Sequence, residues 1–147
     1  MRIGRIEASS GFFLLVAWLN YLDRQNLVLL TFLACFFHEC GHYVAMKVIG
    51  KNVRLIRLTA VGVQMYIEQP LSYVQECFVA VAGPMVNISL AYIAYHWPEQ
   101  ELFAGLNVSL ACFNLLPIGQ LDGSRILNGI LSCLISPLLA VKIVQTV

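Results

Sequence analysis

Charged residues are scarce in this sequence. Aspartate, glutamate, lysine and arginine make up 12% of the 147 residues and hydrophobic residues 59%, whereas a soluble domain carries about 25% charged residues. The few cations form no basic tract and no stripe of lysine and arginine between aromatic residues, which excludes a nucleic-acid partner. We therefore predict an integral membrane protein whose partners lie in or on the lipid bilayer.

Other shortages exclude further kinds of site. The five cysteines are odd in number and lie in or beside apolar segments, so they imply no disulfide framework. The three histidines are too few for a membrane di-iron oxygenase, and the absence of a G-x-S-x-G segment argues against serine catalysis. A site for a single metal ion remains compatible with this composition.

Long apolar segments are what the sequence does have. They cover residues 11–22, 27–49, 77–97, 102–116 and 126–147. The second would be about 35 Å long as a helix, enough to cross a hydrocarbon core of about 30 Å, whereas the first spans only if residues 6–10 extend its helix. We predict an all-α, multi-pass membrane protein, a bundle of about four to five transmembrane helices, with residues 1–147 forming one domain.

Two stretches depart from this helical pattern. Residues 53–68 are rich in β-branched residues and alternate between apolar and polar positions, which predicts a short membrane-associated β-hairpin. The helix over 102–116 runs into Pro117, Gly119 and Gly123, so we expect it to break within the segment NLLPIGQLDG. A broken backbone at membrane depth is tolerated only where it is buried in protein or lines a cavity.

The segment HECGH, residues 38–42, lies within the clearest spanning helix. Residues four apart lie on one side of a helix, so His38 and His42 can bind one metal ion with two imidazole nitrogens. Glu39 is offset from them and can act as general base on water, its role at this spacing in zinc proteases. Ionisable residues within a spanning helix mark a functional site; the alternative is a hydrogen-bonded cluster across the bundle.

A catalytic zinc ion needs a third protein ligand and an open fourth position. Among the carboxylates near apolar segments, Glu68, Glu76 and Asp122, we favour Asp122 because it follows the predicted helix break at the depth of HECGH. The alternative is that Asp122 only caps a helix starting at Ser124. His96 lies at the opposite interface, too far away to share the metal.

Lysine and arginine gather at alternate ends of the apolar segments. Arg2 and Arg5 precede the first segment, Lys47, Lys51, Arg54 and Arg57 follow the second, and Arg125 follows the fourth. The positive-inside rule places these ends in the cytosol. HECGH is then expected in the cytosolic half of its helix.

Three short segments follow one another in the chain. HECGH comes first, then Ala82-Gly83-Pro84 with Asn87 three residues on, then Asn114 to Gly123 in the wording NLLPIGQLDG. In kind and order they resemble the signatures of the site-2 proteases, a family of intramembrane zinc metalloproteases. The short spacing is most similar to the sporulation branch, whose bacterial members release a membrane-tethered sigma-factor precursor. The resemblance covers about residues 27–131.

This resemblance implies one zinc ion (Zn2+) per chain, held by His38, His42 and Asp122. It also implies that Glu39 activates water for peptide cleavage within or near the membrane. Two further residues, Asn87 and Asn114, are expected to line the site. The hairpin would pair with an extended substrate, since a strand edge presents unpaired backbone groups.

The implied function is an intramembrane zinc metalloendopeptidase whose substrate is a membrane-anchored protein, a sigma-factor precursor of sporulation being one candidate. A membrane regulatory partner is also implied. Gln120 and Ser124 depart from the proline and glycine common in the family, and we expect no C-terminal regulatory domain after Val147. Two alternatives stay open: a membrane metal carrier or transporter, because histidine and carboxylate in a bundle also make ion pathways, and an inactive family member that binds membrane partners.

Overall fold

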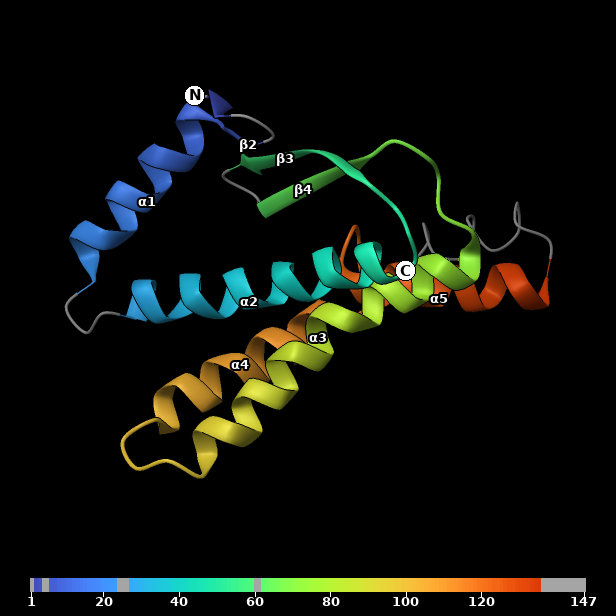
Figure 1. The fold of residues 1–147 in the computed structure, drawn as a ribbon. Coiled ribbons are helices and arrows are strands. Elements are labelled where there is room, and N and C mark those ends of the chain that lie inside the picture. The colour runs from blue at the N-terminus through green and yellow to red at the C-terminus, as the bar shows by residue number, and fades with distance from the viewer. Residues whose placement is uncertain (1, 4–5, 24–26, 60–61, 136–147) are drawn as a thin grey trace.

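The computed structural model describes residues 2–3, 6–23, 27–59 and 62–135, which are mostly helical (Figure 1). The helices are α1 (Ser10–Leu22), α2 (Leu27–Val48), α3 (Tyr73–Tyr95), α4 (Glu101–Asn114) and α5 (Asp122–Leu134). The strands are β1 (Arg2–Ile3), β2 (Ile6–Ala8), β3 (Val53–Thr59) and β4 (Gly62–Ile67). The predicted helical class is confirmed in outline, and residues 136–147 of the last apolar segment lie outside the described part.

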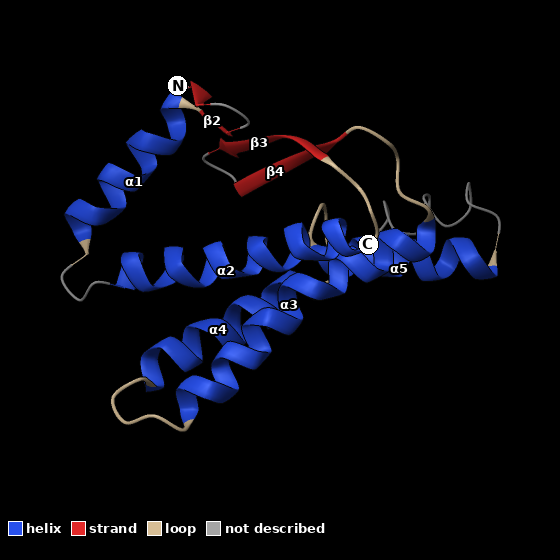
Figure 2. Cartoon of the chain, viewed as in Figure 1, coloured by secondary structure: helices blue, strands red, loops and turns tan. Residues whose placement is uncertain are grey.

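The predicted hairpin over residues 53–68 is confirmed, because β3 and β4 pair antiparallel. It belongs to a larger sheet of order β1-β2-β3-β4, in which β2 runs parallel to β3. Along β4, Val63, Met65 and Ile67 are partly buried while Gln64 and Tyr66 are exposed, as expected for a strand with one covered face. Figure 2 shows the sheet lying above α2, with α4 and most of α3 below that helix.

The N-terminal residues do not lengthen the first helix. Residues 6–8 form β2, whose Glu7 pairs with Arg57 of β3 at 3.1 Å. Ser9 then caps α1, because its side-chain oxygen accepts a hydrogen bond from the backbone N–H of Phe12, which fixes the helix start. The condition under which the first segment would span, a helix extended back to residue 6, is therefore not met, and the 13 residues of α1 span only about 20 Å.

Helix α3 is the centre of the bundle, packing against α2, α4 and α5. It starts with a capping box between Ser72 and Gln75, which satisfies its first backbone N–H groups. Gly41 of α2 lies so close to α3 that a Cβ would meet the carbonyl oxygen of Ala82 at 2.8 Å. Small residues at such a crossing let two helix backbones approach closely.

A small apolar core joins the sheet to the helices. It consists of buried and partly buried side chains from the end of α2, the sheet, the first half of α3 and the connections between them: Ala45, Met46, Ile49, Val53, Ile56, Met65, Ile67, Leu71, Val79 and Ala82. This core fixes the C-terminal end of α2 against the start of α3. It thereby sets the position of HECGH relative to α3.

Two of the described helices are long and apolar enough to cross a membrane, α2 with 22 residues and α3 with 23. Large apolar side chains point outward from the helices, among them Leu14, Trp18, Phe36 and Tyr92, each more than 60% exposed. Such an apolar exterior suits lipid. Because α4 has only 14 residues, shorter than a straight span needs, the count of four to five spans stays a prediction.

Candidate metal centre

Two facing helices carry stripes of residues with a spacing of four. The stripe on α2 is Ala34, His38 and His42, and the stripe on α3 is Val79, Gly83 and Asn87. Residues four apart lie one above another on a helix surface. The two stripes run in opposite directions, because His38 contacts Asn87 and His42 contacts Val79.

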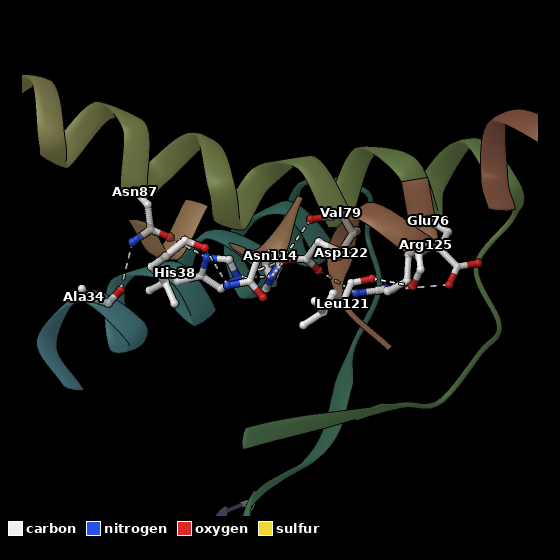
Figure 3. A network of polar contacts seen from close by, with 12 residues as sticks. Ala34, His38, Glu76, Val79, Asn87, Asn114, Leu121, Asp122 and Arg125 are labelled. Carbon is white, nitrogen blue, oxygen red and sulfur yellow. Dashed lines mark hydrogen bonds and ion pairs between the residues drawn. The ribbon is translucent and has the colours of Figure 1, made fainter. Parts of the chain in front are cut away.

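Each imidazole of HECGH is held through its Nδ1 atom. Figure 3 shows His38 beside Asn87. His38 Nδ1 lies 2.5 Å from Asn87 Oδ1, and His42 Nδ1 lies 2.8 Å from the carbonyl oxygen of Val79. A carbonyl oxygen only accepts, so Nδ1 of each ring carries the hydrogen, as assigned from these partners. In the neutral rings, Nε2 then presents a lone pair.

The predicted helix break delivers the third side chain. Helix α4 ends at Asn114 and α5 begins at Asp122, and the loop folds back so tightly that a Cβ on Gly123 would overlap the carbonyl oxygen of Leu115. The N-cap of α5 is Leu121, without a side-chain cap. Asp122 therefore does not act as a helix cap, and its buried carboxylate faces α2 instead.

Three acceptor atoms converge between α2 and α5. Asp122 Oδ2 lies 3.1 Å from His38 Nε2 and 3.2 Å from His42 Nε2, and the two Nε2 atoms are 3.0 Å apart. Buried acceptors at these distances repel one another unless a cation lies among them. Ligands about 2.0–2.1 Å from a tetrahedral zinc ion are themselves about 3.3 Å apart, so the group fits zinc.

Gly83 leaves the space that such an ion needs. A Cβ at this position would lie 2.5 Å from His42 Nε2 and 2.7 Å from His38 Nε2. Because a helical Cβ is fixed by the backbone, any other residue would fill the place where the lone pairs meet. The short distance to the two imidazoles thus explains why a residue without a Cβ stands at position 83.

The Asp122 carboxylate is oriented through both of its oxygens. Oδ2 faces the two imidazoles. Its other oxygen, Oδ1, lies 3.5 Å from Arg125 Nη1, and Arg125 Nε lies 3.4 Å from Glu76 Oε1 of α3. Arg125 thus ties Oδ1 to α3 and leaves Oδ2 for the metal.

Replacing Arg125 with glutamine should weaken zinc binding by about three- to tenfold, at or below the lower end of the range for an outer partner of a ligand. The effect is modest because the contact is long and the Arg125 side chain is 33% exposed. Competition with a chromophoric chelator measures the affinity. Arg57→Gln is the matched control, since Arg57 forms its ion pair within the sheet; equal affinities for both variants would contradict the role of Arg125.

The other predicted site residues lie as follows. Glu39 is partly buried beside His38 on α2, close enough to the three metal-group side chains for its charge to interact with theirs. Asn114 donates a hydrogen bond from Nδ2 to the carbonyl oxygen of Leu110 within its own helix, at 3.0 Å. His96 lies at the far end of α3. The roles of Glu39, Asn87 and Asn114 stay predictions.

Four features around the metal group were not predicted: the Val79 carbonyl, the space at Gly83, Arg125, and Asn107 of α4, which accepts a hydrogen bond from Asn87 Nδ2 at 2.8 Å. Every residue has a backbone carbonyl, so the sequence does not indicate which one contacts a histidine. The presence of a glycine next to a proline in a helix has several possible explanations. Asn107 did give a signal, because a polar side chain in the middle of an apolar helix is costly unless it is partnered. Its partner could only be found in the structure.

Fold and site together define a membrane-embedded protein with a metal site of two histidines and one carboxylate. Peptidase family M50 matches residues 100–147. The chain is 31% identical over 125 residues to a zinc metalloprotease of Methanocaldococcus jannaschii and 30% identical over 129 residues to stage IV sporulation protein FB of Bacillus subtilis. These matches cover 77% and 79% of this chain but 36% and 44% of the relatives, so the chain spans less than half of their length.

A solved structure agrees with these matches. The site-2 protease from Methanocaldococcus jannaschii superposes with a TM-score of 0.69 at 28% identity, over 98% of this chain and 76% of that one. By sequence and by structure the chain is therefore similar to peptidase family M50 and to the site-2 proteases. The predicted zinc cofactor is confirmed by this family and by the group of His38, His42 and Asp122.

Proposed function

We propose that this chain is an intramembrane zinc metalloendopeptidase that cleaves a membrane-anchored protein within or near the bilayer. The observation that carries the proposal is the buried convergence of His38, His42 and Asp122, with Glu39 beside it on a helix long enough to span. A relative named as a zinc metalloprotease and a structure named as a site-2 protease support it.

The side chains divide the work of amide hydrolysis. His38, His42 and Asp122 would hold the zinc ion, and the bound ion would supply a Lewis acid for polarising a carbonyl group and making water more acidic. Glu39 accepts a proton from the attacking water at its carboxylate. The water oxygen bonds to the scissile carbonyl carbon, the C–N bond breaks, and Glu39 passes the proton to the leaving nitrogen. Asn87 and the Val79 carbonyl keep both imidazoles oriented throughout.

The proposal includes an orientation in the membrane. The end of α2, the connection after it, strand β3 and the start of α5 carry Lys47, Lys51, Arg54, Arg57 and Arg125. By the positive-inside rule this end of a multi-pass protein faces the cytosol. The metal group, which α2 and α5 build near the same end, then opens toward the cytosolic side.

The substrate would meet the site as an extended chain. Strand β4 lies at the edge of the sheet, and an edge strand can pair with a peptide through backbone hydrogen bonds. Unwinding also exposes a scissile amide that a helix protects. A sigma-factor precursor of sporulation, the substrate class of the branch that the motifs resemble, is the candidate to test first, together with a membrane partner that regulates cleavage.

Removing the metal tests this function. The purified protein is reconstituted into vesicles with two probes, a membrane-tethered sigma-factor precursor and a single-span peptide with a central Gly-Pro pair. A zinc chelator should lower cleavage, followed on gels, at least about tenfold, and one equivalent of zinc should restore it, because the Lewis acid is essential to the chemistry.

Two outcomes of the same experiment contradict the proposal. Vesicles that take up zinc while both probes stay intact would favour a metal carrier. A folded protein that binds no zinc and cleaves neither probe would favour an inactive member that binds membrane partners. Each outcome is read from zinc content and probe integrity in one preparation.

A further inference from the structure

Asn107 of α4 is a buried polar side chain that the proposed chemistry does not use. Its residue is 0% exposed, and it lies among apolar neighbours in the helix ELFAGLNVSLACFN. A buried amide in a membrane bundle is costly unless its donors and acceptor are partnered. The partners of Asn107 lead directly to the metal group.

A chain of hydrogen bonds connects Asn107 to His38. Asn107 Nδ2 donates to the carbonyl oxygen of Phe103 at 2.9 Å. Asn87 Nδ2 donates to Asn107 Oδ1 at 2.8 Å and to the carbonyl oxygen of Ala34 at 3.2 Å. The Asn87 Oδ1 atom then accepts from His38 Nδ1 at 2.5 Å.

The donors and acceptors in this series of hydrogen bonds are fixed by the backbone carbonyls that it contacts. Backbone carbonyl oxygens only accept, so the atom of Asn107 next to Phe103 must be nitrogen, and its oxygen must face Asn87. The same rule at Ala34 makes nitrogen the facing atom of Asn87 and leaves its oxygen for His38. The orientations of both amides are thus assigned by their partners.

We propose that Asn107 is a positioning residue for the zinc site. Its oxygen holds the amide of Asn87 in place, and Asn87 holds His38 in the tautomer that carries hydrogen on Nδ1 and a lone pair on Nε2. Zinc binds that lone pair, so an apolar residue at 107 should weaken metal binding without touching the metal. This inference rests on the zinc site of the proposed function.

Packing alone does not account for this residue. Asn114, on the same helix, satisfies its Nδ2 by the same bond to the carbonyl four residues earlier, so a helical asparagine needs no partner on another helix for its donor. What Asn107 adds is an acceptor aimed at α3. Outer partners of metal-binding histidines fix the ring and its tautomer and typically change metal affinity 10- to 100-fold.

The test measures cobalt binding, by its visible spectrum, to the metal-free full chain in detergent. Asn107→Leu, close in size, should lower the cobalt affinity by about tenfold. Asn107→Asp, neutral when buried, keeps the acceptor and should stay within about threefold of wild type. Asn107→Ala removes the same oxygen without added branching and should match Asn107→Leu. Ser89→Ala, which deletes an exposed bond within α3, is the control and should bind as wild type does.

A second measurement separates positioning from mere stability. Nitrogen NMR of 15N-histidine in the metal-free protein should show His38 with hydrogen on Nδ1 in wild type and in Asn107→Asp, and a loss of that tautomer in Asn107→Leu. An Asn107→Leu protein with the cobalt affinity and the His38 tautomer of wild type would overturn the inference. An Asn107→Asp protein that binds cobalt as weakly as Asn107→Leu would also overturn it. Wild-type protein that binds no cobalt would overturn the zinc site as well, whereas failed cleavage with intact cobalt effects would overturn only the proposed activity.

Discussion

Glu39→Gln should lower peptide cleavage by about 10²- to 10⁴-fold, the range for losing a general base, while zinc stays bound. Glutamine has the same shape but cannot accept a proton from water. Zinc is retained because Glu39 is not one of the converging ligands, which are His38, His42 and Asp122. The loss should therefore appear in turnover and not in metal content.

Cleavage of the sigma-factor precursor and zinc content are measured on the same vesicles. Glu101→Gln is the control, because Glu101 is an exposed carboxylate in the first turn of α4 and should cleave at the wild-type rate. A Glu39→Gln variant that cleaves normally would remove Glu39 from the mechanism. A variant that loses zinc would instead make Glu39 a ligand.

The centre of the site could be predicted because its signals are local. The spacing of four between His38 and His42 follows from helix geometry alone, and a carboxylate placed after a run of helix breakers is rare enough to stand out. The break itself was readable from Pro117 and Gly119, since neither continues a helix easily. These features need no knowledge of the rest of the chain.

The parts that were missed depend on distant segments. Strand β2 pairs in parallel with β3, although α1 and α2 lie between the two strands in the sequence. The three residues of β2 are too few to reveal such a partner. Asn87 was expected only through the family resemblance, because a single amide does not say which helix it faces. The Val79 carbonyl and the Asn107 bond become visible only when α3 is placed against its neighbours.

Helix α3 explains why these distant parts matter together. It supplies the Val79 carbonyl to His42, the Asn87 amide to His38, and bare backbone at Gly83 between them. One helix face thus sets the orientation of both imidazoles and the space in front of them. A substitution at the middle of this face should therefore lower the metal affinity more than it lowers the stability of the fold.

Gly83→Ala should weaken zinc binding at least about 100-fold, at or beyond the upper end for changes outside the ligands, and should remove cleavage with it. The new Cβ would stand 2.5 Å from His42 Nε2, and the imidazoles can move away only by giving up their Nδ1 bonds. The clash is with side chains, so the helices should still pack. Cobalt titration measures the affinity, and circular dichroism and the unfolding temperature report the fold.

Two other glycines make this prediction specific. Gly105 of α4 has nothing within 4 Å of a Cβ, so Gly105→Ala should bind zinc as wild type does and gain up to about 1 kcal/mol from better helix propensity. Gly41→Ala would press on the backbone oxygen of Ala82 and should destabilise the α2–α3 crossing itself. Wild-type metal affinity in a folded Gly83→Ala protein would show that the metal does not lie against α3, and the role given to that helix in orienting the ligands would have to be abandoned.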